Sequence, residues 1–259
     1  MKAERIPHVD GPPGIRLGPG WALFLDVDGT LLDIALRPDE VTVPPGLTIG
    51  LAKLAERLGG ALALVSGRTI DNLDRLFAPL VLPAAGVHGA ELRLAPGLPV
   101  AAAPAEPALT DALPVLRRLA DAWPGVVVED KGRAVAVHFR LAPAAEPAIV
   151  TTMTAIAAKG GGLEVLPGHM VRELRDGRHT KGTAVRTFMA TSPFMGRRPL
   201  FLGDDVTDED GFRAAEAAGG VALAVGHHPG LGRPAVFGRP ADVRAWLAQA
   251  GLDGAGDGE

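Results

Sequence analysis

The chain has 259 residues, of which 47% are hydrophobic and only 4% aromatic, so it can form one large α/β domain or two smaller ones. Its net charge of -4 argues against non-specific binding to nucleic acid or to a membrane surface. The absence of cysteine excludes disulfides, thiolate metal sites and a cysteine nucleophile.

Residues 1–19 are rich in proline and glycine and lack the apolar segment of a signal peptide, so a flexible lead-in is expected there. No apolar run approaches the roughly 18 residues that a membrane-spanning helix needs. These features, with the lack of cysteine, predict a cytoplasmic protein. We expect a monomer or a weak homodimer that binds neither nucleic acid nor membranes.

The first predicted strand is the apolar run 21–25, which ends at Asp26 and Asp28 before the turn residue Gly29. Such a run is typical of a strand buried on both faces of a parallel sheet. Residues i and i+2 of a strand point the same way, so both carboxylates should converge beyond its carboxyl end, where ligands bind in open α/β sheets. Two close carboxylates need a cation or a proton between them, although a plain acidic turn is the alternative.

Helix and strand patterns then alternate along the chain. The apolar spacing predicts a helix over 47–58, a buried strand over 61–65, a helix with Leu73, Leu76 and Phe77 on one face, and a short strand at 81–82. This alternation is typical of a doubly wound parallel sheet.

The pattern changes after residue 92. A linker rich in proline and alanine, 95–107, precedes a predicted helix over 109–119, a hairpin over 126–140, a helix over 144–158 and a second hairpin turning at Pro167-Gly168. Hairpins between helices predict an inserted α+β unit over about 104–176. In the first hairpin, Val135, Val137 and Phe139 should share one face, and His138 and Arg140 the other.

The first pattern resumes with a helix that opens near Lys181, strands over 199–202 and 221–225, and a helix over 243–250. The fold class is therefore predicted as α/β, with a doubly wound core over 20–103 and 177–250. The insert 104–176 forms a smaller α+β domain, and residues 251–259 are expected to be a flexible tail.

Three further polar segments lie near predicted strand ends or helix starts. Ser66, Gly67 and Arg68 form either a simple helix cap or an anion-binding loop, since a hydroxyl and a glycine amide at a helix start attract anions. Lys181 is either an ordinary exposed lysine or the partner of an anion, because cations are disfavoured at helix N-termini.

The third segment, 204–210, carries five acids in seven positions. A capping box with Thr207 as the cap and Asp210 three residues later explains part of it. It does not explain Asp204 and Asp205 at the end of an apolar strand. Oxygen ligands without histidine or cysteine suit a hard cation such as Mg²⁺. Acids around a cation, beside a hydroxyl, an amide and a lysine, form a site for a phosphoryl group.

These motifs, in this order, resemble those of haloacid dehalogenase (HAD) superfamily phosphatases. The matching segments are Asp26-Val-Asp28-Gly29-Thr30, Ser66-Gly67-Arg68, Lys181-Gly182, and Gly203-Asp204-Asp205 with Asp208. The resemblance implies that Asp26 is the nucleophile and Asp28 the general acid and base, whose backbone carbonyl also contacts the metal. It implies a Mg²⁺ site completed by Asp204 with Asp205 or Asp208, and phosphate binding by Ser66, Gly67 and Lys181.

A narrower resemblance is to trehalose-6-phosphate phosphatases, and it covers about residues 21–226. It rests on Gly86-Val-His88-Gly89-Ala-Glu91, on Glu129-Asp-Lys131 with His138-Phe-Arg140, on Arg172-Glu173 and on the segment 203–212. The resemblance implies that the insert is a cap that recognises a sugar phosphate. The implied sugar contacts are Arg68, His88, Glu91, Glu129, Lys131, Arg140 and Glu173; the alternative for the cap residues is a solvated surface.

Other functions remain open at this point. The chain could act on sucrose phosphate, mannosylglycerate phosphate or a hexose phosphate instead. It could also be a phospho-acceptor switch module, which likewise places an aspartate among acids and a lysine. Asp28 argues against a switch, because an acid-base two residues from the phosphorylated aspartate would hasten loss of the phosphoryl group.

Overall fold

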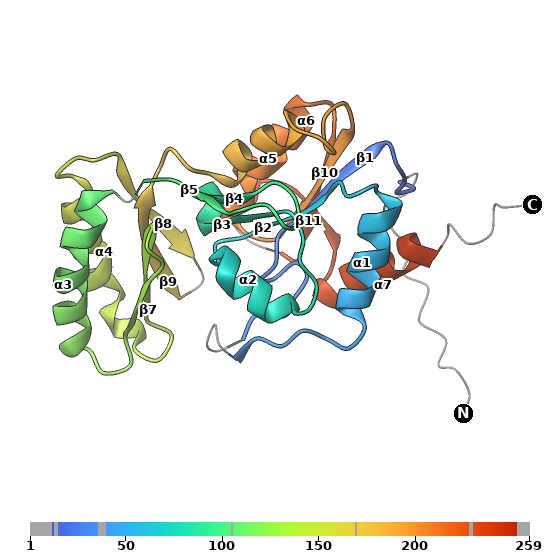
Figure 1. Cartoon of the computed structure of the whole chain (residues 1–259). Helices are drawn as coiled ribbons and strands as arrows, with labels where there is room; N and C mark the ends of the chain where they lie inside the picture. The colour runs from blue at the N-terminus through green and yellow to red at the C-terminus, as the bar shows by residue number, and fades with distance from the viewer. Residues whose placement is uncertain are drawn as a thin grey trace, which may run out of the picture.

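The computed structural model describes residue 12 and residues 15–35, 40–104, 106–168, 170–227 and 230–252. Two sheets organise these residues, one of eight strands and one of four. Figure 1 shows the two sheets in separate lobes joined side by side. The predicted lead-in 1–19 and tail 251–259 lie largely outside the described residues.

The strand β1 (Trp21–Leu25) lies in the middle of the large sheet, between β10 (Arg198–Gly203) and β2 (Leu62–Val65). These strands are parallel, and β11 (Val221–Val225), β12 (Ala235–Phe237) and β3 (Ala84–Gly86) extend the parallel arrangement at both sides. The predicted parallel α/β core is thus confirmed. The carboxyl ends of β1, β2 and β10 meet at one edge, where the predicted polar motifs follow them.

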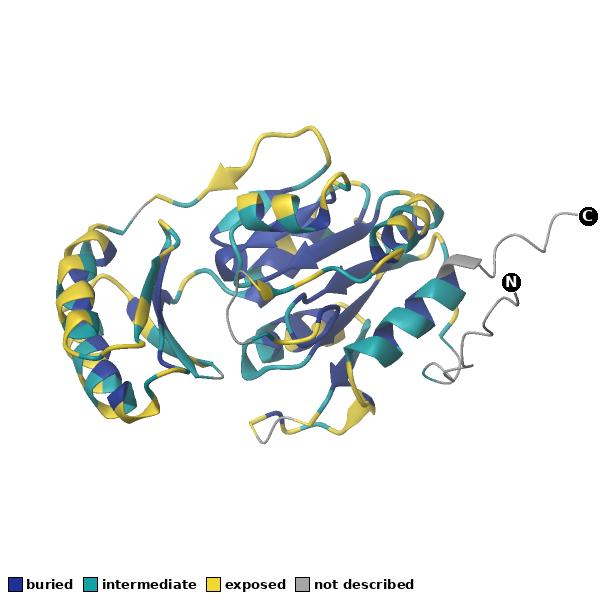
Figure 2. Ribbon diagram, turned by 90° about the horizontal axis from the view of Figure 1, so that it is seen from below, coloured by how far each residue is buried: buried dark blue, intermediate teal, exposed yellow. Residues whose placement is uncertain are grey.

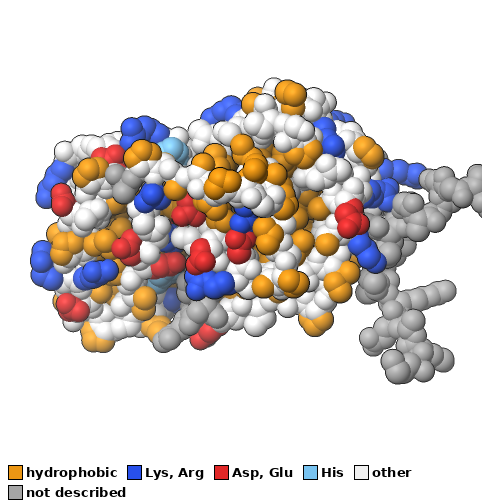
Figure 3. Space-filling model, in the orientation of Figure 1, with side chains coloured by type: hydrophobic (Ala, Val, Ile, Leu, Met, Phe, Trp, Pro, Cys, Tyr) orange, Lys and Arg blue, Asp and Glu red, His pale blue; other side chains and the backbone are white. Residues whose placement is uncertain are grey.

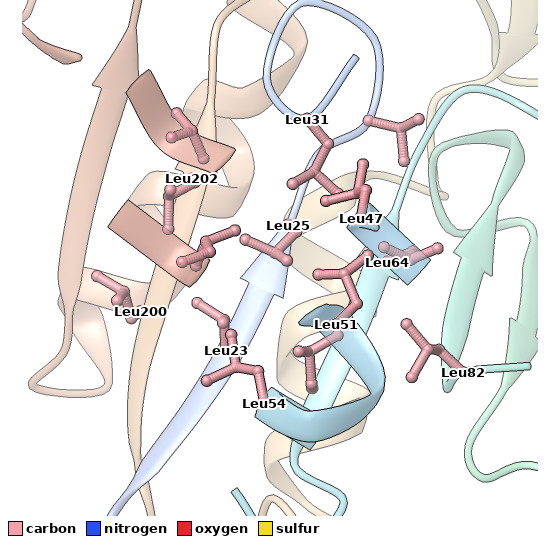
Figure 4. Close-up of a cluster of buried hydrophobic side chains, with 14 of the residues drawn as sticks. Leu23, Leu25, Leu31, Leu47, Leu51, Leu54, Leu64, Leu82, Leu200 and Leu202 are labelled. Carbon is pink, nitrogen blue, oxygen red and sulfur yellow. The ribbon is translucent and has the colours of Figure 1, made fainter. Parts of the chain in front are cut away.

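Helices cover both faces of this sheet, so its strands are buried on two sides (Figure 2). The helices α1 (Leu47–Arg57), α2 (Ile70–Phe77) and α7 (Pro240–Leu252) pack on one face, and α5 (Lys181–Met189) and α6 (Glu209–Ala217) on the other. Alternation along β1 divides its side chains: Leu23 and Leu25 join the leucine cluster of Figure 4, whereas Phe24 stacks on Phe194 at 5.4 Å between ring centres.

Two sequence predictions for this lobe are wrong. The short strand lies at Ala84–Gly86 instead of 81–82, because it begins after Pro83 and the side chain of Val81 is exposed. The predicted linker 95–107 contains the strand β5 (Ala101–Ala102), which was not predicted, and neither was β4 (Glu91–Arg93) just before the linker; both are antiparallel and extend the sheet beyond β3. The sheet is therefore mixed at one side. Strands this short at a sheet edge leave almost no periodic signal in the sequence.

The smaller lobe has a four-stranded antiparallel sheet in the order β6-β7-β9-β8, with α3 (Pro107–Asp121) and α4 (Glu146–Ala157) packed on one face. Its strands are β6 (Val127–Asp130), β7 (Ala134–His138), β8 (Leu163–Gly168) and β9 (Val171–Asp176). The described residues also include the 3₁₀ segments η2 (Val87–Gly89), η3 (Pro143–Ala145) and η4 (Val206–Asp208).

The predicted faces of β7 are observed, since Val135, Val137 and Phe139 are buried in this lobe's core. The predicted turn of the second hairpin is misplaced. Pro167 and Gly168 still belong to β8 and pair with β9. The strand is at the sheet edge, where a proline lacking its N–H is tolerated. The exact boundaries of the insert, 104–176, stay a prediction.

Close packing of α5 against α6 depends on Gly182. A Cβ added at this position would lie 2.5 Å from the backbone oxygen of Asp210. We expect Gly182→Ala to lower the free energy of unfolding by about 1–3 kcal/mol, as overpacking does. Urea denaturation measures this change.

The matched control is Gly50→Ala. Gly50 lies inside α1 with open space around its α-carbon, so alanine should raise the free energy of unfolding by roughly 0.5–1 kcal/mol through helix propensity. Equal effects of the two substitutions would contradict the packing assigned to Gly182.

Candidate active site

A cleft of about 940 Å³ lies at the carboxyl ends of β1, β2 and β10 and is lined by residues of both lobes. Charged side chains of both signs gather where the lobes meet (Figure 3). Most of the predicted site residues line this cleft. From the large lobe these are Asp26, Asp28, Ser66, Gly67, Arg68, His88, Lys181, Asp204 and Asp205, and from the small lobe Glu129, Lys131, Arg140 and Glu173.

Lys181 joins two buried carboxylates at the bottom of the cleft. Its Nζ donates to Oδ1 of Asp26 and to Oδ1 of Asp208, both at 2.7 Å. Thr180 caps α5 and so fixes the backbone from which Lys181 projects. Burial alone would lower the pKa of Lys181, but Asp208 and Asp26 outweigh burial and raise it above its ordinary value. The reading of Lys181 as an ordinary exposed lysine is therefore wrong.

Asp204 completes a group of three carboxylates. One oxygen from each of Asp26, Asp204 and Asp208 lies within 4.8 Å of the others. Burial, together with the charges of Asp26 and Asp208, raises the pKa of Asp204 to about 9. Burial also raises the pKa of Asp208 to about 7, against the opposing effect of Lys181. A cluster in which two of three carboxylates resist ionisation, and which offers oxygen donors only, fits a hard divalent cation.

Thr30 and Gly29 hold Asp204 in place. Thr30 Oγ1 donates to Asp204 Oδ1 at 3.1 Å. Gly29 has a φ of 86°, and a Cβ there would lie 2.0 Å from Asp204 Oδ2. Only glycine combines this backbone conformation with so close an approach.

The other predicted metal ligand of this segment, Asp205, lies outside the three-carboxylate group. Its Oδ1 accepts from the backbone N–H of Val206 at 2.6 Å, and Asp205 with Asp208 forms the capping box of η4. The predicted cap, Thr207, is wrong, because Asp205 has the extended backbone of a cap residue and Thr207 already lies within the turn. Asp208 Oδ2 also accepts from the backbone N–H groups of Asp204 and Asp205.

Asp28 points away from these carboxylates and pairs with Arg68. Nε and Nη2 of Arg68 each donate to one oxygen of Asp28 at 2.7 Å. Nη1 of Arg68 donates to Oδ1 of Asn72 at 2.7 Å, one helical turn further along α2. Neither this bidentate pair nor Asn72 was predicted, because nothing in the spacing relates residues 40 positions apart. Arg68 thus contacts the predicted acid-base, whereas its predicted contact with a sugar is untested.

Ser66 does not cap α2, since Thr69 accepts the capping hydrogen bond from Asn72. The buried Ser66 Oγ instead accepts from the backbone N–H of Arg68 at 3.2 Å. The loop after β2 therefore folds back on itself at the cleft. This conformation excludes the plain helix cap at Ser66, and anion binding by the loop stays a prediction.

The small lobe adds an ion-pair network. Lys131 Nζ donates to Glu173 Oε2 at 2.6 Å and to the backbone oxygen of Gly67 at 2.9 Å. Despite burial, Lys131 and His88 lower the pKa of Glu173, so it stays ionised. Glu129 Oε2 lies 2.8 Å from His138 Nε2, and Arg140 also lines the cleft.

One predicted sugar contact, Glu91, is absent from the residues that line the cleft. Its Oε2 accepts from the backbone N–H of Ile70 at 2.8 Å, at the start of α2. A carboxylate there satisfies an unpaired amide and complements the helix dipole. Glu91 has this structural contact because β4 pairs antiparallel to β3 and directs it towards α2.

The two-lobed fold is similar to that of a phosphatase of the haloalkanoate (HAD) enzyme superfamily from Bacteroides thetaiotaomicron, which is 18% identical and superposes with a TM-score of 0.55 over 83% of this chain and 86% of its own. The match of the trehalose-phosphatase family to residues 24–235 covers most of the chain, which therefore belongs to this family.

Relatives of known name agree with this assignment. A probable trehalose-phosphate phosphatase of Sinorhizobium fredii is 48% identical over 80% of this chain and 78% of its own length. The trehalose-6-phosphate phosphatase of Escherichia coli is 38% identical over 90% of this chain and 87% of its own. The crystal structure of a trehalose-6-phosphate phosphatase related protein, 26% identical, superposes with a TM-score of 0.74 over 90% of this chain and 97% of its own.

Within the described residues, no helix is both long and apolar enough to span a bilayer.

The charge of Lys181 should be necessary for both stability and activity. We expect Lys181→Met to lower the free energy of unfolding in EDTA by about 3–5 kcal/mol, since it leaves buried carboxylates uncompensated. Urea denaturation measures this loss. Lys53→Met, at an exposed position of α1, is the matched control and should change stability by less than about 0.5 kcal/mol. A Lys181→Met protein as stable as the control variant would refute the role given to this lysine.

Proposed function

We propose that this chain hydrolyses trehalose 6-phosphate to trehalose and inorganic phosphate through an aspartyl-phosphate. The observation that carries the proposal is the position of Asp26, buried at the end of β1 with one oxygen held by Lys181 at 2.7 Å and facing a cleft between two lobes. The names of the two curated relatives support the substrate.

In the first half-reaction, Asp26 attacks phosphorus and the bond from phosphorus to the sugar oxygen breaks. Asp28 gives its proton to that oxygen, so trehalose leaves as the alcohol. In the second half-reaction, Asp28 takes a proton from the water that attacks the aspartyl-phosphate, which regenerates Asp26 and releases phosphate. Splitting one difficult step into two in this way is the advantage of covalent catalysis.

The phosphoryl group is held by Ser66, by the amide of Gly67 and by Lys181. Asp26, Asp204 and Asp208, whose oxygens lie within 4.8 Å, would hold Mg²⁺, with the backbone carbonyl of Asp28. When bound, Mg²⁺ supplies positive charge that neutralises the carboxylates and the phosphoryl oxygens. Asp205 contributes to this site by fixing the turn that carries Asp208.

Asp28 must change partners during this cycle. Both carboxylate oxygens of Asp28 accept hydrogen bonds from Arg68, so neither is open to a sugar oxygen or to a water molecule while this pair holds. To donate a proton to the leaving sugar it must first be protonated, so the pair with Arg68 has to loosen. The substrate's own negative charge gives Arg68 an alternative partner at that stage.

Glu129, Lys131, Arg140 and Glu173 of the small lobe are the proposed sugar-reading residues. Sugar hydroxyls both donate and accept, and a site built to bond them rejects analogues that lack them. Carboxylates, ammonium and guanidinium groups on one wall of the cleft supply both kinds of partner. Closure of the small lobe would also exclude water from the phosphoryl group.

Phosphate release across a panel of sugar phosphates tests the substrate. We expect trehalose 6-phosphate to be preferred over sucrose 6-phosphate, mannosylglycerate phosphate and hexose phosphates, with activity abolished by EDTA and restored by Mg²⁺. Asp26→Asn should remove turnover without loss of fold. Preference for another sugar phosphate would refute the proposed substrate, and phosphate release by Asp26→Asn would refute the nucleophile.

Asp28→Asn tests the acid-base. We expect the rate to fall by roughly 10²–10⁴, which is the usual contribution of a positioned proton donor. The loss should be smaller for p-nitrophenyl phosphate, because its leaving group needs little protonation. Stopped-flow and steady-state measurements of phosphate release give the rates with both substrates. The role would be excluded by an unchanged rate with the sugar phosphate.

A further inference from the structure

His88 lies where the two lobes touch. Its side chain is buried, and Nε2 lies 3.2 Å from Oε1 of Glu173 in the small lobe. Nδ1 is buried and has no hydrogen-bond partner among the described residues. A neutral imidazole carries one N–H, which on Nε2 would face Oε1 of Glu173; at 3.2 Å this is a close contact rather than a well-aligned hydrogen bond, and Oε1 is also buried without a hydrogen-bond partner among the described residues.

The backbone that carries His88 is strained. Val87 and His88 have φ values of 45° and 56°, a left-handed conformation that costs energy for residues with a Cβ. The backbone N–H groups of these two residues donate to the backbone oxygens of Arg68 and Ser66, both at 2.9 Å. The strained turn is thus hydrogen-bonded to the proposed phosphate-binding loop, residues 66–68.

The imidazole also lies directly against that loop. A Cβ added at Gly67 would be 2.7 Å from His88 Nε2, so the ring occupies the space that a side chain at Gly67 would need. Lys131 closes a ring of contacts, because its Nζ bonds both Glu173 and the backbone oxygen of Gly67. These contacts therefore connect the two lobes through four residues: His88, Glu173, Lys131 and Gly67.

We propose that His88 is a positioning residue that fixes Glu173 for sugar recognition and links this recognition to the phosphate-binding loop. It acts through Glu173 and does not itself contact the sugar. The inference rests on the proposed function and differs from the sequence prediction, which placed His88 among the sugar contacts. The groups that surround the imidazole, Glu173, Arg175, Lys181 and Lys131, are all charged, and burial lowers its pKa, so it remains neutral.

His88→Asn is the informative variant, because asparagine tolerates a left-handed backbone but is too short to reach Glu173. We expect kcat/KM for trehalose 6-phosphate to fall roughly tenfold or more, because Glu173 loses its 3.2 Å contact with the imidazole. The kcat/KM for p-nitrophenyl phosphate, which has no sugar, should change by less than about threefold. His88→Gln, whose longer amide can donate to Glu173, should recover part of the loss.

Combining His88→Asn with Glu173→Gln separates the alternatives. If His88 acts through Glu173, the double variant should be little worse than Glu173→Gln alone. Additive losses would mean that His88 touches the sugar itself, and equal losses on both substrates would mean that it only supports the loop; either result overturns the inference. If trehalose 6-phosphate is not the substrate, the wild-type panel shows this independently of the His88 variants. The variants are then compared on the sugar phosphate that the wild type prefers.

Discussion

Concentrated negative charge at the buried ends of the central strands is the constraint on which the rest of this structure depends. Asp26, Asp204 and Asp208 lie close enough for their oxygens to share one small site. Such an arrangement persists only with compensation, and Lys181 supplies part of it from the first turn of α5. The tight approach at Gly29 and the capping box of Asp205 and Asp208 then follow, because each fixes one carboxylate of the group.

The second lobe is proposed to meet a different requirement, which is to distinguish one phosphate ester from another. Its sheet turns a hydrophobic face towards α3 and α4 and a polar face towards the cleft. The two requirements meet at Gly67, whose amide is proposed to bind phosphate and whose carbonyl accepts from Lys131. In the proposed function, chemistry and recognition are therefore separated by lobe but share the loop that contains Gly67.

Much of this organisation can be predicted from the sequence. Apolar runs that end in Asp26, Ser66 or Asp204 identify strands and their functional ends, because strand direction alone brings those residues to one edge. The faces of β7 follow from simple alternation. The pairs Arg68–Asp28 and His88–Glu173 could not be predicted, since they depend on side-chain directions across loops. The strands β4 and β5 were missed because three and two residues are too few to show alternation, and the contact of Glu91 with the start of α2 was not predicted because a motif position does not show which neighbour it contacts.

The short connection from β9 to α5 has a consequence for the exchange of lobes between enzymes. Glu173 lies on β9, which ends at Asp176, and Lys181 begins α5 with four residues between the strand and the helix. A graft intended to change sugar preference must therefore reproduce the length of this connection. An inserted residue would alter the phase of α5 and displace the lysine from both carboxylates. The entry to the lobe, from Ala102 of β5 to Pro107 of α3, is equally short, but neither of these elements carries a residue of the three-carboxylate group, so the exit of the lobe, rather than its entry, sets the tolerance of recombination.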